Sequence, residues 1–403
     1  MYLSSTRAAA PAPAGGRPRS FRVPATVMAL GLVSFFTDVS SEMIAAFLPM
    51  YVLYGLGAGY LQLGLLDGLH TGASALLRLA GGHLADRLAR PKAVAMAGYG
   101  LSALSKLLFP VAGGAVAGIS AAITVDRAGK GLRTAPRDAL ITAATPPPLL
   151  GTAFGVHRAL DTAGALLGPV AVFALVAVIG DAYDTVFVTS FCLALIGLVI
   201  LACFVRERRT EPGTRPKVVL KDGLRLVSDP ALRRVTLYAG LFGLVTAGDA
   251  FVFVAVQRQA GLPVGTLPLL PLATSLVFLL AAVPLGRLAD RMGGWRVFLI
   301  GHALLASSYV LLALPATALL ALPLLGLFYA ATDGVLMALL AHRLPGHLRA
   351  SGLALTQTAQ AVARAGGAVG FGVLATGLGL GWSFTAAGLA LAVILLTAWR
   401  SPS

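Results

Sequence analysis

Long apolar stretches separated by short polar ones occupy almost the whole chain. Twelve of these stretches reach about 20 residues, the length at which an α-helix crosses the hydrocarbon core of a bilayer. They are expected at residues 25–54, 61–82, 93–113, 116–143, 151–178, 185–204, 233–257, 266–288, 296–314, 317–342, 350–376 and 380–399. The pattern therefore predicts an all-α integral membrane protein with twelve transmembrane helices.

The polar segments divide this series into two groups of six spans. Residues 1–22 are rich in Ala, Pro, Gly and Arg and lack the apolar core of a signal peptide, so we expect a disordered tail. Residues 205–232 are polar, contain three prolines and separate the sixth span from the seventh. We therefore expect a tail at 1–22, a six-helix bundle at 23–204, a linker at 205–232 and a second six-helix bundle at 233–403.

One short phrase occurs in both groups of spans. Gly82-His83-Leu84-Ala85-Asp86-Arg87 returns as Gly286-Arg287-Leu288-Ala289-Asp290-Arg291, at an offset of 204 residues. The same offset aligns Ala46-Phe47 with Ala250-Phe251. A half-length repeat in a membrane protein indicates two similar bundles joined in parallel, with a pathway between them.

The composition agrees with a membrane protein and excludes a soluble domain. Hydrophobic residues make up 57% of the chain and charged residues 12%, and the mean hydropathy is +0.85. A soluble domain carries about 25% charged residues. Two cysteines, Cys192 and Cys203, share the sixth span at a separation of about 16 Å along a helix, which is too far for a disulfide.

The net charge of +15 is explained by where the basic residues lie. They gather before the first span, after the second, in the linker and between the tenth and eleventh spans, whereas the turns around Gly57, Gly113 and Gly379 carry no charge. Arg258 is the single exception on that second side. By the positive-inside rule, both termini are expected in the cytoplasm of a multi-pass protein of the cell membrane. Anionic lipid heads are a secondary partner of the basic loops, and nucleic acid is not expected.

Charged side chains inside the spans are the candidates for chemistry. Arg127 lies about eleven residues into the fourth span, where a charge costs about 2.5–3.5 kcal/mol unless it faces a partner or a wet cavity. Asp38 and Glu42 are four residues apart on the first span and share one face. His157, Arg158 and Asp161 occupy one turn of the fifth span, while Asp67 and His70 share a face of the second. The second bundle has fewer such residues: Asp249, Asp333, Gln357, Gln360 and Arg364.

Three sequence patterns resemble signatures of the major facilitator superfamily. The repeated phrase and Lys92 resemble the loop signature Gly-x-Leu-x-Asp-Arg-x-Gly-Arg-Lys, with Ala89 where Gly is usual and Pro91 before Lys92. In the fourth span, Ile123, Arg127 and Gly131 resemble Leu-x-x-x-Arg-x-x-Gln-Gly, with Lys130 in place of Gln. In the fifth span, Gly155, Gly164, Gly168 and Pro169 resemble the Gly-x8-Gly-x3-Gly-Pro signature of proton-coupled drug exporters, without its terminal glycine pair.

The resemblance implies the superfamily fold, two pseudo-symmetric six-helix bundles, and assigns roles to residues. Conformational gating falls to Gly82, Asp86, Arg87, Gly286, Asp290 and Arg291, and helix packing to Gly155, Gly164, Gly168 and Pro169. Proton coupling falls to Asp38, Glu42, Arg127 and Asp161, because a carboxylate that alternates between an apolar site and a nearby arginine takes up and releases a proton. The alternative for these charges is a static ion-pair network.

The superfamily lines its cavity with spans one, four, seven and ten and places spans two, five, eight and eleven beside them. On this basis the expected substrate-cavity residues are Phe35, Lys130, Arg133, His157, Arg158, Asp249, Asp333 and Gln357. The two glycines of Gly164-x3-Gly168 are one turn apart and permit a close helix approach, and Pro169 kinks the fifth span.

The resemblance implies a monomeric secondary active transporter that moves a small organic solute by alternating access, with proton-coupled efflux. A proton-linked importer of a sugar or organic anion is the alternative, because Arg127, Lys130, Arg133 and Arg158 suit an anion. A membrane receptor or enzyme without transport is more distant, since the sequence has no Ser/His/Asp constellation. Metal-ligand spacing and a nucleotide-binding loop of the Gly-x4-Gly-Lys-Ser/Thr type are missing too, so we expect no metal, cofactor or ATP.

Overall fold

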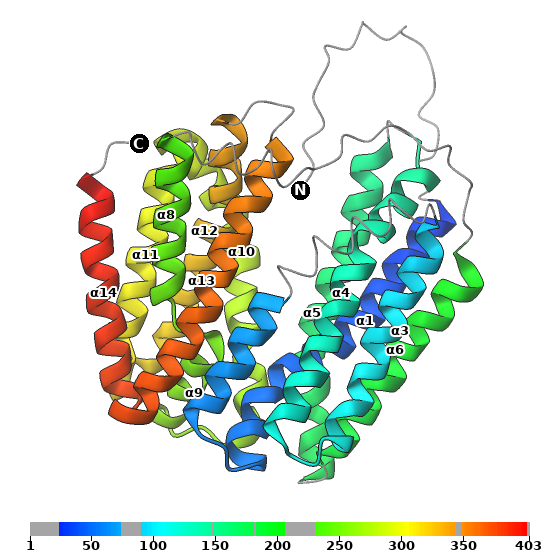
Figure 1. The fold of residues 1–403 in the computed structure, drawn as a ribbon, viewed down its shortest axis with the longest axis horizontal. Coiled ribbons are helices and arrows are strands. Elements are labelled where there is room, and N and C mark those ends of the chain that lie inside the picture. Colours follow the sequence, from blue (N-terminus) through cyan, green and yellow to red (C-terminus); the bar gives the residue numbers. More distant parts are fainter. Residues whose placement is uncertain are drawn as a thin grey trace, which may run out of the picture.

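The computed structural model describes residues 24–73, 90–146, 149–180, 183–205, 230–343 and 349–400, and within these ranges the chain is helical without strands. The helices lie side by side in two groups (Figure 1). By chain order the first group contains α1 (Ala25–Met50), its π-helical extension η1 (Tyr51–Gly55), a helix at residues 60–73, α3 (Pro91–Val111), α4 (Val116–Ala144), α5 (Leu150–Ile179) and α6 (Asp184–Phe204). The second contains α8 (Pro230–Val245), α9 (Asp249–Gln259), η4 (Val264–Leu269), α10 (Leu270–Met292), α11 (Gly294–Leu311), η5 (Pro315–Leu320), α12 (Ala321–Arg343), α13 (Arg349–Leu378) and α14 (Leu380–Arg400). Of the first group, the helix at 60–73 lies against α13 of the second group (Figure 1).

The predicted all-α membrane fold is confirmed. Among the described residues, ten helical stretches are long and apolar enough to cross a bilayer. The fourth predicted span is a helix of 29 residues, α4, but its charged residues keep it outside that group. The second predicted span is described only as far as residue 73.

The seventh predicted span is interrupted, although its sequence suggests one continuous helix. α8 ends at Val245 and α9 begins at Asp249, and residues 246–248 between them are not helical. Gly248 adopts an extended conformation at the N-cap of α9 (φ −62°, ψ 145°), and Asp249 places a carboxylate in the first turn, where the helix dipole favours it. The hydroxyl of Tyr309 accepts a hydrogen bond from the Ala247 amide at 2.8 Å, so the interruption is supported from α11.

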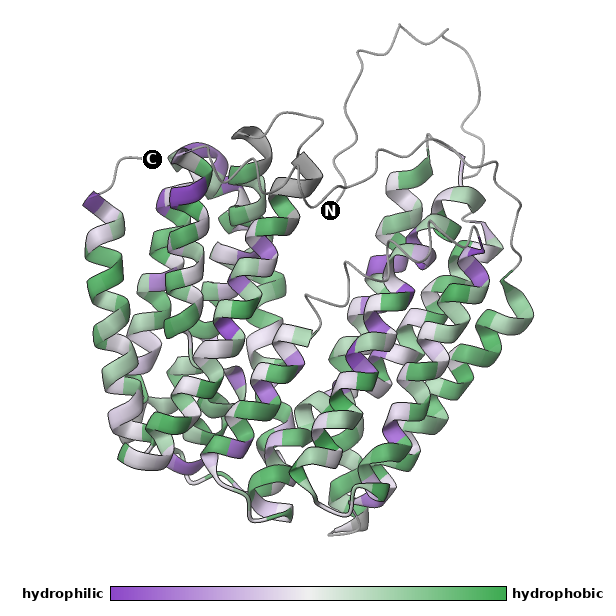
Figure 2. Cartoon of the chain, in the orientation of Figure 1, coloured by the Kyte–Doolittle hydropathy of each residue, from purple (hydrophilic) through white to green (hydrophobic). Residues whose placement is uncertain are grey.

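The outer surface of the bundle is apolar, as a lipid-facing surface has to be. On α14, Val393, Leu396 and Trp399 are each more than half exposed. Figure 2 shows hydrophobic positions over most of the ribbon, with hydrophilic positions along α4 and α5 on the side that faces the second group. Because exposed apolar surface is unfavourable in water by about 25 cal/mol per Å², these faces belong in a bilayer.

Small residues bring the helices of the first group into close contact. A Cβ on Gly98 of α3 would lie 2.8 Å from the carbonyl oxygen of Gly129 on α4, and one on Gly164 of α5 would lie 2.4 Å from that of Phe35 on α1. Such contacts between backbones hold helices together in lipid, where apolar burial provides little driving force.

The two groups meet on one side of the molecule. We call the side where α1 begins and α14 ends the terminal side, and the opposite side, where α9 ends, the far side (Figure 1). The helix at 60–73 contacts α13 closely: a Cβ on Gly64 would lie 2.5 Å from the Ala368 carbonyl oxygen, and one on Gly372 would lie 2.8 Å from that of Tyr60. η4 also contacts α1 and α5. The ribbons of the two groups diverge toward the terminal side (Figure 1).

Candidate functional site

A buried carboxylate on α4 binds two basic side chains. Asp126 contacts the Lys106 ammonium of α3 and the guanidinium of its neighbour Arg127, and all three side chains are at most 8% exposed. Ser102 donates a hydrogen bond of 2.6 Å to the same carboxylate, and Arg127 Nε donates one of 2.9 Å. Arg127 is therefore held by the adjacent residue of its own helix rather than by Asp38 or Glu42.

A second cluster lies between α1, α4 and α5. Lys130 of α4 lies close enough to Asp38 and Glu42 for its positive charge to act on both. Arg133 Nη2 lies 3.8 Å from Asp38 Oδ1 and its guanidinium lies 4.7 Å from the centre of the Tyr99 ring. The second guanidinium nitrogen of Arg133, Nη1, is buried without a hydrogen-bond partner among the described residues.

Asp38 has a second carboxyl group beside it. Asp161 of α5 lies close enough to Asp38 for its like charge to act on that carboxyl group. Arg137 Nη1 lies 3.9 Å from the Asp161 carboxylate and Arg158 Nη1 lies 3.5 Å from it. The Arg158 side chain is 79% exposed, so its pair with Asp161 is screened by solvent and weak. Two carboxylates that lie close together repel each other, and a proton on one of them removes this repulsion.

Two further predicted cavity residues lie near the terminal side of the first group. His157 Nε2 is 2.9 Å from the hydroxyl of Ser34, and both side chains are buried. Phe35 is half-buried and contacts Phe36 edge to face at 5.2 Å between ring centres. The Ser34–His157 contact therefore helps to hold α1 against α5 where the charged cluster begins, whereas the ring contact of Phe35 stays within α1.

The second group has its own polar cluster, built around a tyrosine. Tyr329 of α12 donates a hydrogen bond of 2.5 Å to Asp249 on α9. The same hydroxyl accepts one of 2.5 Å from Arg364 on α13, whose guanidinium lies 5.2 Å from the ring centre. Asp333 lies one turn farther along α12 and its charge acts on Arg364. The phenol thus links the acid and the base of two helices.

Asp67, from the helix at 60–73, lies next to this cluster of the second group. A Cβ on Gly248 would lie 1.8 Å from Asp67 Oδ2, so the carboxylate reaches the interruption between α8 and α9. The charges of Asp249 and Arg364 act on it. Discontinuous helices mark binding sites in many transporters, because their free ends present dipoles to ions and solutes.

Two polar residues on helices of the second group are exposed. Asp333 is exposed near the centre of α12, and Gln357 is exposed on α13. A carboxylate at that depth is unfavourable against lipid. Their exposure therefore indicates a water-accessible space between the two groups.

The gating and helix-packing residues are distributed as follows. Gly82, Asp86 and Arg87 lie outside the described residues. In the second copy, Gly286 has no neighbour within 4 Å of an added Cβ, and Asp290 and Arg291 are exposed at the end of α10.

On α5, Gly164 and Gly168 press against α1, whereas Gly155 has open space around it. A Cβ on Gly168 would lie 2.7 Å from the Glu42 Cβ. α5 remains helical through Pro169, from Leu150 to Ile179.

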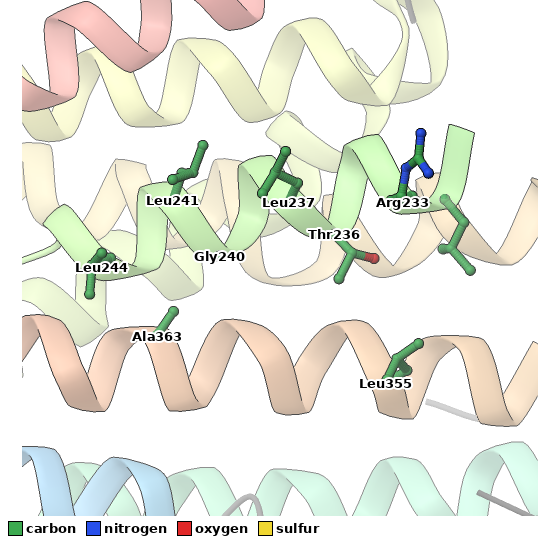
Figure 3. A pocket seen from close by; sticks show the side chains of 9 residues that line it. Arg233, Thr236, Leu237, Gly240, Leu241, Leu244, Leu355 and Ala363 are labelled. Carbon is green, nitrogen blue, oxygen red and sulfur yellow. The ribbon is translucent and has the colours of Figure 1, made fainter. Parts of the chain in front are cut away.

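A cavity of about 420 Å³ lies elsewhere, between α8 and α13 (Figure 3). Its lining is apolar apart from two side chains, and Leu237 and Leu244 in its wall are more than half exposed. The lining residues are Leu232, Arg233, Thr236, Leu237, Gly240, Leu241, Leu244, Leu355 and Ala363. It contains none of the predicted substrate-cavity residues and forms a groove in the lipid-facing surface.

Sequence reasoning missed several partners that the structure brings together. Lys106 and Arg137 were not singled out, although each is a charge inside an apolar stretch and so requires a partner. Asp67 was noted but not placed in the site. Tyr54 and Tyr60 contact Arg258. The sequence around them does not indicate this role, because tyrosines are common near the ends of spans.

A family model and two curated relatives match the chain. The family model described as Major Facilitator Superfamily matches residues 30–368, well over half of the chain. An uncharacterised MFS-type transporter of Methanocaldococcus jannaschii is 28% identical over 284 residues, which are 68% of this chain and 69% of that protein. An uncharacterised protein of Mycobacterium tuberculosis is 36% identical over 157 residues, covering 39% of this chain and 38% of its own length.

Solved structures share the fold. The crystal structure of the nucleoside transporter NupG superimposes with a TM-score of 0.81 at 12% identity and covers 94% of this chain and 100% of that chain. A POT family transporter in complex with 5-aminolevulinic acid gives a TM-score of 0.73 at 17% identity, covering 94% and 96%. At such low identity these likenesses establish the fold alone.

Proposed function

The chain belongs to the major facilitator superfamily, and on this premise we propose that it exports a small organic solute in exchange for protons. Family and fold point to secondary transport of a solute across a membrane rather than to an enzyme. The direction of transport and the coupling to protons are what we propose beyond the family and the fold. The terminal side then faces the cytoplasm and the far side faces outward, as the distribution of basic loops predicts.

The observation that carries the proposal is the Asp38–Asp161 pair. Its two carboxyl groups belong to different helices, α1 and α5, and a proton held by one of them would remove the repulsion between their like charges. Arg133 and Arg137 approach the pair at 3.8 Å and 3.9 Å. These distances exceed a hydrogen bond, so a small movement of α4 toward the pair would favour proton release and the reverse movement proton uptake.

The Asp126 cluster and the Asp38 cluster of the first group are suited to different roles. Asp126 is fully engaged by Lys106, Arg127 and Ser102, so it is suited to holding α3 and α4 together. Glu42 has no hydrogen bond within the described part of the chain, and Lys130 is its strongest basic neighbour. The loosely paired carboxyl groups are therefore the better candidates for a proton that comes and goes.

Solute would bind between this cluster and the one around Tyr329. Asp67 lies at the edge of this space, since it extends from the first group to Gly248 in the second. Rocking of one group against the other would change which charges face each other, and this would couple the proton to the solute. The fit of Gly164 and Gly168 against α1 links the exporter-type signature of α5 to the helix that carries Asp38.

An organic anion is the second candidate for the transported solute. Arg133 Nη1 is buried without a partner among the described residues, and a carboxylate or phosphate on the solute would supply one. This candidate changes the solute class and leaves the proton pair in place.

Inverted membrane vesicles test the proposal directly. With an imposed gradient that is acid inside, we expect accumulation of at least one member of a panel of drugs, nucleosides, sugars and organic anions, abolished by a protonophore. Vesicles without the protein are the control. Accumulation only in right-side-out vesicles, acid outside, would identify an importer. Transport in neither orientation would contradict the proposal.

A further inference from the structure

Arg258 breaks the charge pattern of the loops, and the structure shows what it contacts. It lies near the end of α9 on the far side, where the sequence otherwise places no basic residue. Its Nε donates a hydrogen bond of 3.2 Å to Tyr54, and a terminal nitrogen donates one to Tyr60. The guanidinium lies 5.7 Å and 5.4 Å from the two ring centres. Two tyrosines of the first group thus hold one arginine of the second.

Tyr54 has a second partner on α9, Gln257. Tyr54 donates a hydrogen bond of 2.7 Å to Gln257 Oε1, and the amide nitrogen of Gln257 donates one of 2.7 Å to the Leu262 carbonyl oxygen. Tyr54 therefore bridges two consecutive residues of α9. The position of Gln257 is fixed in turn by the chain that follows α9.

The position of this contact follows from the internal repeat. Tyr54 and Arg258 are 204 residues apart, the same offset that relates the two copies of the repeated phrase. They are therefore corresponding residues of the two halves. In an assembly of two similar halves, corresponding residues contact each other only close to the symmetry axis. The contact lies on that axis, where opening of the far side has to begin.

We propose that Tyr54, Tyr60 and Arg258 form the gate that keeps the far side closed and that this gate must separate once in each transport cycle. The proposal rests on the proposed transport function and adds to it the residues that control one of its two openings. Beside the gate, the close contact of Gly64 and Gly372 continues the closure toward the middle of the membrane.

A polar gate suits a contact that has to be broken repeatedly. Arg258 is exposed, so its guanidinium and the two phenols are able to exchange their mutual contacts for water when the halves part. A lysine would keep the charge but lose the planar group that stacks on the rings and donates in two directions. The gate is therefore expected to depend on the guanidinium rather than on charge alone.

The test measures far-side opening without needing a solute or a proton gradient. Ala368 is buried between the helix at 60–73 and Gly248, and Ala368→Cys is introduced after Cys192→Ser and Cys203→Ser. A membrane-impermeant maleimide is added to right-side-out vesicles. We expect Arg258→Ala to raise the labelling rate about tenfold, as for loss of one hydrogen bond to a charged group. Arg258→Lys and Tyr60→Phe should give smaller increases.

Arg296→Ala is the matched control, since it removes an exposed arginine of α11 at the terminal end of that helix. Its labelling rate should equal that of the parent. Equal rates in Arg258→Ala and the parent would overturn the gate, whatever the transport assay shows. If Arg258→Ala does not fold, Tyr60→Phe and Arg258→Lys decide, and unchanged labelling in both would also overturn it. Faster labelling of a protein that shows no detectable transport would support the gate and would contradict only the transport proposal.

Discussion

At the scale of single residues, two buried clusters show how a charge is compensated by a side chain from another helix or from the next residue. Asp126 compensates Lys106 and Arg127 together, and Asp249 is joined to Arg364 through the hydroxyl of Tyr329. Removing a shared partner leaves charges without compensation in a low-dielectric interior, which costs more than the pair itself contributes.

This reasoning predicts unequal effects for the two ends of the Asp126 cluster. Asp126→Asn leaves Lys106 and Arg127 buried together without a counter-charge, and we expect a loss of about 3–5 kcal/mol in stability. Lys106→Met keeps the Asp126–Arg127 pair and should lower stability less. Thermal unfolding of the purified proteins in detergent measures both. A melting temperature in Asp126→Asn equal to that of the parent would show that the carboxylate does not hold the cluster.

The proton pair gives a prediction about pH. Asp38→Asn removes the like charge beside Asp161 and cannot exchange a proton, so the transport rate should lose its dependence on pH while exchange of solute across the membrane persists. Rates are measured in proteoliposomes over a range of pH, with Glu42→Gln as the companion variant. If Asp38→Asn keeps the parent profile and Glu42→Gln loses it, the proton belongs to Glu42.

The sequence predicts which charged residues in the spans need a partner, but it does not predict which residue the partner is. The requirement for a partner at Arg127 follows from its depth in an apolar span. Its pairing with Asp126 could not be predicted, because adjacent residues of a helix usually point in different directions and the orienting contact comes from Lys106 on α3.

At the scale of helices, close contacts between backbones determine how α5 sits on α1. Gly164 and Gly168 occupy positions where any side chain would meet Phe35 or Glu42, whereas Gly155 on the same helix faces open space. The three glycines of the exporter-type signature are therefore not equivalent.

That difference is testable with one added methyl group. Gly164→Ala would place a Cβ 2.4 Å from the Phe35 carbonyl oxygen, so α5 has to move and we expect a loss of about 1–3 kcal/mol. Gly155→Ala meets nothing and should be neutral or slightly stabilising, because alanine favours helix more than glycine does. Thermal unfolding of the two variants compares them, and equal losses would contradict the observed packing of α5 on α1.

Hydropathy predicted the spans well, because the bilayer imposes one requirement on every helix that crosses it. The interruption at residues 246–248 escaped this reasoning, since the stretch is short and its neighbours are apolar. Its support comes from Tyr309 and Asp67, which lie on other helices, and a local pattern does not report such contacts.

At the scale of the whole molecule, the repeat predicted two similar halves but not which ends of them touch. The contacts of the helix at 60–73 with α13, of η4 with α1 and α5, and of Arg258 with Tyr54 join the halves on the far side. The polar clusters lie between that joint and the terminal side. A rocking movement about this arrangement would open the far side as the terminal side closes.

Paired distances between spin labels test this central claim most directly. After replacement of Cys192 and Cys203, one label pair is placed at Thr152 and Met292, at the terminal ends of α5 and α10, and another at Val111 and Leu314 on the far side. We predict that a change from alkaline to acid pH shortens one mean distance while it lengthens the other. Two distances that stay fixed, or that change in the same direction, would contradict alternating access.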